Sequence, residues 1–324
     1  GNETYIYMVD PSDGSLNYDL RLGTSSIEQA GWAGEDASGN LVVAGMHNIA
    51  DGVITSLDSA AALNWDQIYT ATGTTRLKMA LDDSGNIYVL HHSNSGSTFM
   101  DFLAINPSTG AISSSQGYSA SVSYTPFNMT AADGGNITVS FADQVTSPRR
   151  NQFLAVNSSF TEQAEWALRD QFNLLDYNGG EVDVDSSGNV YALFSAGSDA
   201  ILVKMTSSGT IVWQNAFEAS SGSASPVDLK VMRDQDNEPL LVVISNNVSP
   251  AESVLFRLPS DGSGTGATVG NISYDTFSGA ESVSTTNYST TSAGTSASAV
   301  SVTYTNGTEA DTGTDYVDVS RTAI

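Results

Sequence analysis

Short apolar runs separated by polar, glycine-containing turns follow one another along most of the chain. Five of these runs, among them residues 87–90 and 190–194, come directly after a related turn and are rich in β-branched, aromatic and leucine residues. Runs of this length and composition predict β-strands rather than helices. Because their apolar residues are continuous, we expect both faces of these strands to be buried.

The turn before each run has the form Asp-x-Ser-Gly-Asn. Intact copies lie at residues 36–40, 82–86 and 185–189, and degraded copies lie at 132–136 and 234–238. An Asp side chain accepts hydrogen bonds from N–H groups of such a turn, and glycine adopts the positive φ that other residues resist. Each copy is therefore predicted to close a β-hairpin. Successive copies lie roughly 50 residues apart, which indicates an internal repeat.

A second turn recurs with the same period and is marked by a serine, at Ser12, Ser59, Ser108, Ser159, Ser207 and Ser260. In four copies an aromatic residue follows six or seven positions later, as Tyr18, Trp65, Trp166 and Trp213. A repeat unit of this size cannot bury both of its faces by itself, so units must stack on one another. We expect the aromatic residues to fill the space between neighbouring units.

The two turns together define a unit of four antiparallel strands in about 50 residues, the size of one β-propeller blade. The predicted fold is an all-β propeller over residues 1–278. Its expected blades are residues 28–71, 72–122, 123–174, 175–221 and 222–278, preceded by a half-blade at 3–24. Because a lone half-blade exposes a strand edge, we expect six blades, with five or seven as alternatives. The strands that complete the half-blade come either from the tail or from sequence ahead of residue 1.

Residues 279–324 form a tail in which neither turn recurs. The tail is rich in Ser, Thr, Ala and Gly, a composition that fits a flexible linker. Apolar and polar residues nevertheless alternate over residues 300–304, and Asn306-Gly307 is a hairpin signal, so an extended β-type segment is favoured. We expect the tail either to close the ring or to link the propeller to something else.

The charge and the absent cysteines exclude several classes of function. The 36 acidic residues against 11 basic ones give a net charge of −25, which opposes nucleic acid because phosphates must be neutralised by clustered Lys or Arg. No apolar run is long enough for a membrane helix, so no membrane insertion is expected. The lack of cysteine excludes disulfides, thiolate nucleophiles and zinc-thiolate sites. High acidity suits solubility outside a cell.

Few residues stand out as candidate ligands or catalysts. The histidines lie at the ends of predicted strands and are considered for ligand binding, as is a local basic pair: His47, His91, His92, Arg149 and Arg150. Four acidic residues open the third strand of a blade and are considered for metal binding: Asp51, Asp101, Asp199 and Glu252. Ordinary loop roles are favoured for all of them, because no calcium-loop spacing is present. No Gly-x-Ser-x-Gly elbow or single carboxylate pair indicates an enzyme, and no cofactor is expected.

Residues 199–213, together with Asp185-Ser-Ser-Gly-Asn-Val-Tyr191, resemble the bacterial β-propeller repeat called the SBBP repeat. The resemblance covers roughly residues 1–278, and the third and fifth copies of the turn depart from the pattern. It implies a propeller of secreted and surface proteins and carries no catalytic signature. The composition of the tail is similar to that of structural virion proteins of marine tailed phages.

From these features we expect a non-catalytic structural or adhesive module on a virion appendage, such as a tail or fibre. The alternative is a secreted or cell-surface bacterial propeller that binds glycan or protein, and a polysaccharide-degrading enzyme is a third hypothesis. The expected partners are other chains of a larger assembly or a cell-surface glycan or protein. The expected location is extracellular or on the virion surface.

Overall fold

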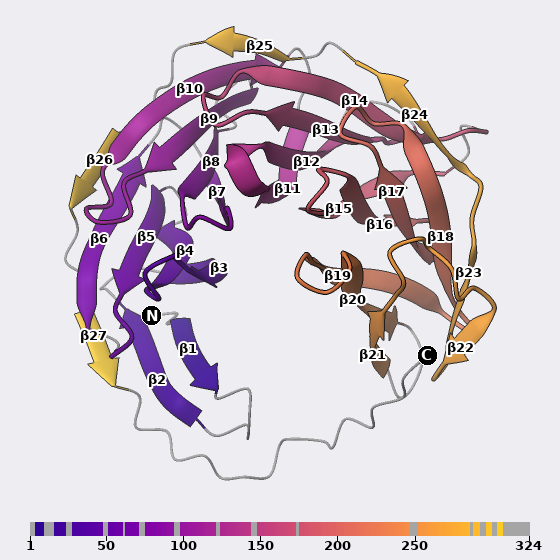
Figure 1. Cartoon of the computed structure of the whole chain (residues 1–324), viewed down its shortest axis with the longest axis horizontal. Helices are drawn as coiled ribbons and strands as arrows, with labels where there is room; N and C mark the ends of the chain where they lie inside the picture. The colour runs from indigo at the N-terminus through magenta and orange to yellow at the C-terminus, as the bar shows by residue number, and fades with distance from the viewer. Residues whose placement is uncertain are drawn as a thin grey trace.

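The computed structural model describes residues 4–9, 16–23, 28–47, 51–60, 62–70, 75–93, 98–120, 124–143, 148–172, 175–246, 252–285, 288–291, 296–299 and 303–306. These residues form an all-β propeller, with five blades and a half-blade arranged around an axis (Figure 1). Among them, no helix is long and apolar enough to cross a membrane.

The strands of each blade pair antiparallel in sequence order, from the axis outward (Figure 1). The first blade contains β3 (Glu28–Glu35), β4 (Leu41–His47), β5 (Asp51–Leu57) and β6 (Leu63–Thr70). The second contains β7 (Thr75–Leu81), β8 (Ile87–Ser93), β9 (Thr98–Ile105) and β10 (Ile112–Ala120). The third contains β11 (Tyr124–Ala131), β12 (Ile137–Asp143), β13 (Asn151–Val156) and β14 (Glu162–Asp170).

The fourth blade contains β15 (Tyr177–Val184), β16 (Val190–Ala196), β17 (Asp199–Met205) and β18 (Ile211–Ala219). Among the described residues, the fifth contains β19 (Ser223–Met232), β20 (Glu238–Asn246) and β21 (Glu252–Arg257). The half-blade is the pair β1 (Thr4–Val9) and β2 (Leu16–Gly23). The turn expected between β1 and β2 lies outside the described residues.

The Asp-x-Ser-Gly-Asn turns close hairpins between the first and second strands of their blades, as predicted. In the fourth blade, Oδ1 of Asp185 accepts the backbone N–H groups of Ser187 and Asn189 at 2.9 and 2.8 Å. The side-chain amide of Asn189 donates to Oδ2 of the same aspartate at 2.8 Å, and Gly188 has φ of 79°. The turns at 36–40 and 82–86 repeat these hydrogen bonds.

The hydrophobic core lies between the blades. The described buried apolar residues form four clusters, each of which joins two consecutive blades. Alternate residues of β16 belong to different clusters, because Ala192 packs toward the third blade and Leu193 toward the fifth. This confirms the expectation of strands buried on both faces for β16, whereas β20 alternates between buried and half-buried positions along its length.

The aromatic residues of the outer strands pack between blades, as expected. Nε1 of Trp65 donates to the carbonyl of Pro107 at 2.6 Å, and Nε1 of Trp213 donates to that of Ser260 at 3.2 Å. The ring of Trp166 packs over Gly209. Each tryptophan therefore contacts the serine-marked turn of the next blade, where a glycine leaves room for the ring. The side chain of Tyr18 lies outside the described part of the chain.

At the interface between the second and third blades, a different residue fills the space that a tryptophan fills at the other interfaces. β10 has Ser114 opposite Ala104, where β6 has Trp65 opposite Ser56. The turn that faces β10 has Phe160 in place of glycine, and Phe160 adopts a φ of 57°. Its ring lies 5.9 Å from that of Phe102. A large residue on the turn thus replaces the missing large residue on the strand.

The residues after the fifth blade form an outer belt, which we define as β22 (Ala267–Val269), β23 (Ile272–Thr276), β24 (Ala280–Ser284), β25 (Tyr288–Thr291), β26 (Ser296–Ala299) and β27 (Thr303–Asn306). The belt runs back around the ring in reverse order (Figure 1). β23 pairs with β18, β24 with β14, β25 with β10, β26 with β6 and β27 with β2. The prediction of a β-type tail is confirmed.

Two features of the belt differ from the expectations. The strand after Gly262, expected to be the fourth strand of the fifth blade, instead joins β18, where Tyr274 stacks on Phe217 with ring centroids 5.1 Å apart. In the described part of the chain, the fifth blade therefore has three strands. The tail also supplies no inner strands to the half-blade among the described residues, because β27 pairs with the outer strand β2. In both places the belt pairs with the backbone groups of an outer edge, which would otherwise be open.

Substitution of two turn glycines separates the cost of backbone strain from the cost of side-chain crowding. Gly188 and Gly209 have φ of 79° and 85°, but a Cβ on Gly188 would meet no atom within 4 Å, whereas one on Gly209 would lie 2.6 Å from Cγ of Trp166. We expect Gly188→Ala to lower the free energy of unfolding by about 1 kcal/mol and Gly209→Ala by about 3 kcal/mol. Urea unfolding of both variants measures this, and equal losses would contradict the packing of Trp166 on that turn.

Candidate functional site

The first strands of the five blades surround a cavity at the axis of the propeller. Its volume is about 920 Å³, and residues of β3, β7, β11, β15 and β19 line it. The cavity opens beside the Asp-x-Ser-Gly-Asn turns, since Ala37 and Asp83, the second residues of two of those turns, also line it. The variable position of the turn is thus placed at the mouth of the cavity.

Several residues of each first strand line this cavity, and we select from each blade one large or polar residue near the middle of the strand. The five residues, which we call the axial ring, are Trp32, Lys78, Asn128, Glu181 and Asp228. Four of them directly follow a register shift: β3, β11, β15 and β19 are each irregular just before the ring residue. Because a β-bulge re-aims the side chain beside it, the shifts change the direction of these four side chains at the cavity wall. Trp32 also packs against the core cluster between the first and second blades.

Glu181 is central to the electrostatics of the axial ring. The side-chain amide of Asn128 donates to its Oε2. Burial, reinforced by the carboxylate of Asp228, raises the pKa of Glu181 from 4.5 to about 7, although Lys78 and the hydrogen bond from Asn128 act in the opposite direction. A carboxyl group with this pKa can be neutral or charged near neutral pH, so it can either donate or accept a hydrogen bond.

Arg233 and Asp183 join the inner strands next to the axial ring. Nη2 of Arg233 lies 3.2 Å from Oδ1 of Asp183 and donates to the carbonyl of Ala131 at 2.9 Å, while Nε donates to the carbonyl of Val184 at 2.9 Å. Nη1 contacts Asp83 at 2.6 Å. A single side chain of the fifth blade therefore reaches the second, third and fourth blades.

Asp183 is almost completely buried and has several partners. It accepts hydrogen bonds from Oγ1 of Thr130 at 2.6 Å and from the backbone N–H of Val231 at 2.8 Å. Nζ of Lys230 lies 3.3 Å from its Oδ2. A buried carboxylate needs such partners because it has lost its water. The arrangement fixes the position of β15 relative to β11 and β19.

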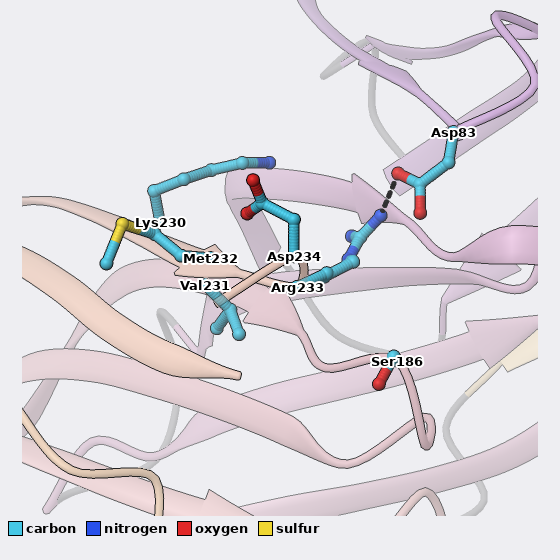
Figure 2. A pocket seen from close by; sticks show the side chains of 7 residues that line it. All are labelled: Asp83, Ser186, Lys230, Val231, Met232, Arg233 and Asp234. Atoms are coloured by element: carbon cyan, nitrogen blue, oxygen red, sulfur yellow. Dashed lines mark hydrogen bonds and ion pairs between the residues drawn. The ribbon is translucent and has the colours of Figure 1, made fainter. Parts of the chain in front are cut away.

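A second cavity, of about 530 Å³, adjoins the axial one and shares Asp83 and Lys230 with it (Figure 2). Figure 2 shows Arg233 directed at Asp83, with Lys230 and Asp234 extending above it and Ser186 below. Ser186 and Asp234 belong to the repeated turns of the fourth and fifth blades. The turns thus provide polar side chains around the mouth of the axial cavity.

The histidines and acidic residues that were considered as ligand candidates lie at the other ends of the strands. His91 pairs with Asp101 across β8 and β9, and His47 pairs with Asp51 across β4 and β5. Burial lowers the pKa of His91 to about 4, against the opposing influence of Asp101 and Asp51, so it is neutral at pH 7. Its neighbour His92 is also buried and lies opposite Met100.

The remaining candidates are dispersed. Asp199 accepts a hydrogen bond from Oγ of Ser198 at 2.9 Å, and Glu252 accepts the backbone N–H of Asn271 at 3.0 Å. Arg149 is exposed and Arg150 half-buried in the loop before β13. Within the described parts of the chain, no group of three or more His, Asp or Glu residues could hold a metal ion.

The axial ring and Arg233 were missed by the sequence analysis. A signal for the ring exists: Trp32, Lys78, Asn128 and Glu181 each stand four residues before the first position of a repeated turn. These positions differ in residue type from blade to blade, while the turn that follows is repeated. No comparable pattern marks Arg233, because its partners come from three other blades.

The comparisons with known proteins give no family. No protein-family model matches the chain, and neither does any curated protein. Among solved structures, the chain is similar to a protein of unknown function from Bacteroides caccae, at 13% sequence identity and a TM-score of 0.39. That similarity covers 65% of this chain and 70% of the other.

The pKa of Glu181 leads to a pH-dependent stability. Because its pKa rises from 4.5 to about 7 on folding, the native state binds more protons than the unfolded state between these values, and stability falls as the pH rises through that window. We expect Glu181→Gln to match the wild type at pH 4.5 and to exceed its free energy of unfolding by about 1–3 kcal/mol at pH 8. Urea unfolding at both values measures this, with Glu218→Gln on the exposed face of β18 as the control. A constant difference at the two pH values would contradict the shift.

Arg233 provides a test of whether its contacts with Asp183 and its other partners join the inner strands of the blades. We expect Arg233→Met to lower the free energy of unfolding by about 3 kcal/mol, because it removes a partner of buried Asp183. Arg257→Met is the matched control: it removes an ion pair with Glu238 in which the arginine side chain is 55% exposed, against 12% for Arg233. Its expected cost is below about 1 kcal/mol. Equal costs in chemical denaturation would show that Arg233 does not join the blades.

Proposed function

We propose that this protein is a non-catalytic recognition module that binds a neutral glycan in its axial cavity. The observation that carries the proposal is the axial ring, in which five blades each place one residue of the set Trp32, Lys78, Asn128, Glu181 and Asp228 in the same cavity. Binding sites for small molecules combine an apolar surface with a few placed polar groups. Trp32 supplies the flat surface, and the other four supply donors and acceptors for hydroxyl groups.

The charges of the cavity select against anionic ligands. Its lining includes Glu35, Glu181 and Asp228 among several carboxylates, whereas Lys78 and Lys230 are its cations. Carboxylates near one another repel an anion, and the chain as a whole has a net charge of −25. A neutral sugar avoids this repulsion and still accepts hydrogen bonds from Lys78 and Asn128 and donates them to Glu181 and Asp228.

We place this module on a virion appendage, outside the cell, where it displays the axial cavity toward a host surface. The composition of the tail and the acidity of the chain support this location, and other chains of the assembly are its structural partners. A secreted or cell-surface bacterial propeller is the alternative, supported by the resemblance of residues 199–213 to the SBBP repeat. Neither setting involves nucleic acid or insertion into a membrane.

A polysaccharide-degrading enzyme is a second candidate, favoured by one specific observation. The raised pKa of Glu181, next to Asp228, is the property expected of a general acid beside a second carboxylate. The experiment on glycan binding therefore includes a measurement of cleavage.

The test is binding of the full chain to an array of bacterial surface glycans, followed by calorimetric titration with the neutral oligosaccharide that binds most strongly. We expect Trp32→Ala to weaken binding by at least about tenfold. Phe172→Ala is the control, since Phe172 is an aromatic residue that is 69% exposed outside the cavity. We expect its affinity to equal that of the wild type.

Three results would overturn the proposal. Absence of binding to every neutral glycan would exclude the ligand class, and unchanged binding by Trp32→Ala would exclude the axial ring as the site. New reducing ends released by the wild type but not by Glu181→Gln would show an enzyme instead of a binding module.

A further inference from the structure

A further cavity lies between the third and fourth blades, at the end of the strands where the repeated turns are found. Its volume is about 320 Å³, and it shares no lining residue with the axial cavity. Residues of three strands of the third blade line one side, and residues of both turns of the fourth blade line the other. Among them are Thr138, Ala155, Ala164, Gly188, Ser207 and Ser208. The cavity is therefore separate from the proposed glycan site.

The cavity exists because one row of paired residues in the third blade is small. Thr138 of β12 pairs with Ala155 of β13, and Ala155 pairs with Ala164 of β14. The first and second blades have one aromatic residue in the equivalent row and the fourth blade has two, namely Trp65, Tyr88, Tyr191 and Trp213. Trp166 does not fill the row, because it pairs with Phe153 two residues further along β14. The third blade thus lacks a ring that the other three contain.

In the interface between the second and third blades, a tyrosine takes up the corresponding space. Tyr88 and Thr138 are each the second residue after the repeated turn of their blade. A Cβ on Gly135, in the turn of the next blade, would lie 2.6 Å from Oη of Tyr88. Gly188 holds the same place in the turn of the fourth blade, and a Cβ there would meet no atom within 4 Å. The position of the tyrosine hydroxyl is therefore empty beside Gly188.

The interface between the fourth and fifth blades shows which groups such a hydroxyl contacts. Oη of Tyr191 donates to the carbonyls of Asn237 and Ser260 in the fifth blade at 3.3 and 3.5 Å. Counted along the two turns, these residues correspond to Gly188 and Ser207, which line the cavity. Asn237 also has a positive φ, of 59°, like Gly188 at 79°. The carbonyls of Gly188 and Ser207 are thus the expected acceptors for a hydroxyl between the third and fourth blades.

We propose that this cavity binds a phenol ring, which a ligand supplies in place of the tyrosine that the third blade lacks. The ring lies against the row of Thr138, Ala155 and Ala164, and its hydroxyl donates to the carbonyl of Gly188 or Ser207. Burial of the ring against small apolar side chains provides affinity, and the hydroxyl fixes its orientation. Ligand reaches the cavity past lining residues that are exposed, namely Asn136, Gln163, Ser207 and Ser208.

The probe is p-cresol, which is the side chain of tyrosine as a free molecule, and toluene is the comparison without a hydroxyl group. Dissociation constants with the full chain are measured by ligand-observed NMR. We expect p-cresol to bind with a Kd of about 1 mM or lower, and at least about fivefold more tightly than toluene. A blocked tripeptide with tyrosine between two glycines distinguishes two sources of the ring. If it binds at least as tightly as p-cresol, the site takes a tyrosine of a peptide, and if only p-cresol binds, the site takes a free phenolic molecule.

Two variants locate the bound ring. Thr138→Tyr restores the missing side chain, and we expect it to weaken p-cresol binding at least about tenfold, because the ring of the protein then fills the cavity. Thr268→Tyr, at an exposed threonine of β22, is the matched control and is expected to change the Kd less than about twofold. Gly188→Ala places a methyl group where the hydroxyl is expected, and it should weaken binding at least about fivefold.

The proposal is overturned if p-cresol does not bind, or if toluene binds as tightly. Wild-type affinity in Thr138→Tyr would also overturn it, because the ligand would then lie elsewhere. If Thr138→Tyr does not fold, Gly188→Ala decides by the same criterion, since its added methyl group meets no atom of the protein within 4 Å.

Discussion

The buried carboxylate of Asp183 is the constraint on which the inner part of the propeller depends. It lies where the third, fourth and fifth blades meet, and it is stabilised by donors from Thr130, Val231, Lys230 and Arg233 of the neighbouring blades, in addition to the N–H of Val184. Removal of water from a charge is costly, so these partners must be present together. Since the blades are joined to one another mainly by apolar surfaces, this polar junction fixes their register along the axis, and with it the level at which the axial ring residues meet.

The repeats predicted the blades because their chemistry is local. Asp185, Gly188 and Asn189 form their turn from hydrogen bonds within five residues, so the sequence pattern alone was sufficient. The packing of Trp65 and Trp213 was also predictable, because the period places each next to the following blade. Phe160 shows the limit: it replaces a turn glycine and is understood only once its neighbours Phe102 and Tyr88 are known.

The pairing of the outer belt and the position of the axial ring could not be predicted, because both depend on contacts between distant blades. Where β23 pairs with β18, Tyr274 stacks on Phe217, and no repeat rule connects these two residues. Glu181 enters the axial cavity because of a register shift in β15, where the carbonyl of Gly180 accepts a hydrogen bond from Ser140 and the backbones of Gly180 and Leu193 approach closely. The histidines were the obvious candidates by residue type, yet His91 is buried and neutral near the opposite ends of the strands. Residue type alone was therefore a poor guide to the site, and position within the repeat was a better one.

The reverse direction of the outer belt has a consequence for the order in which the molecule folds. The blades are made of neighbouring strands, so each can form from local contacts. The belt cannot form from local contacts. Its successive strands pair Asp275 with Ala216, Ser284 with Trp166, Ser289 with Ser119, Ala297 with Tyr69 and Asn306 with Leu20. The span of chain between partners grows at every step, and contacts of larger separation form more slowly. The belt is therefore expected to close last and in sequence from β23 to β27, so that the blades form first and the belt strands pair with their outer edges afterwards.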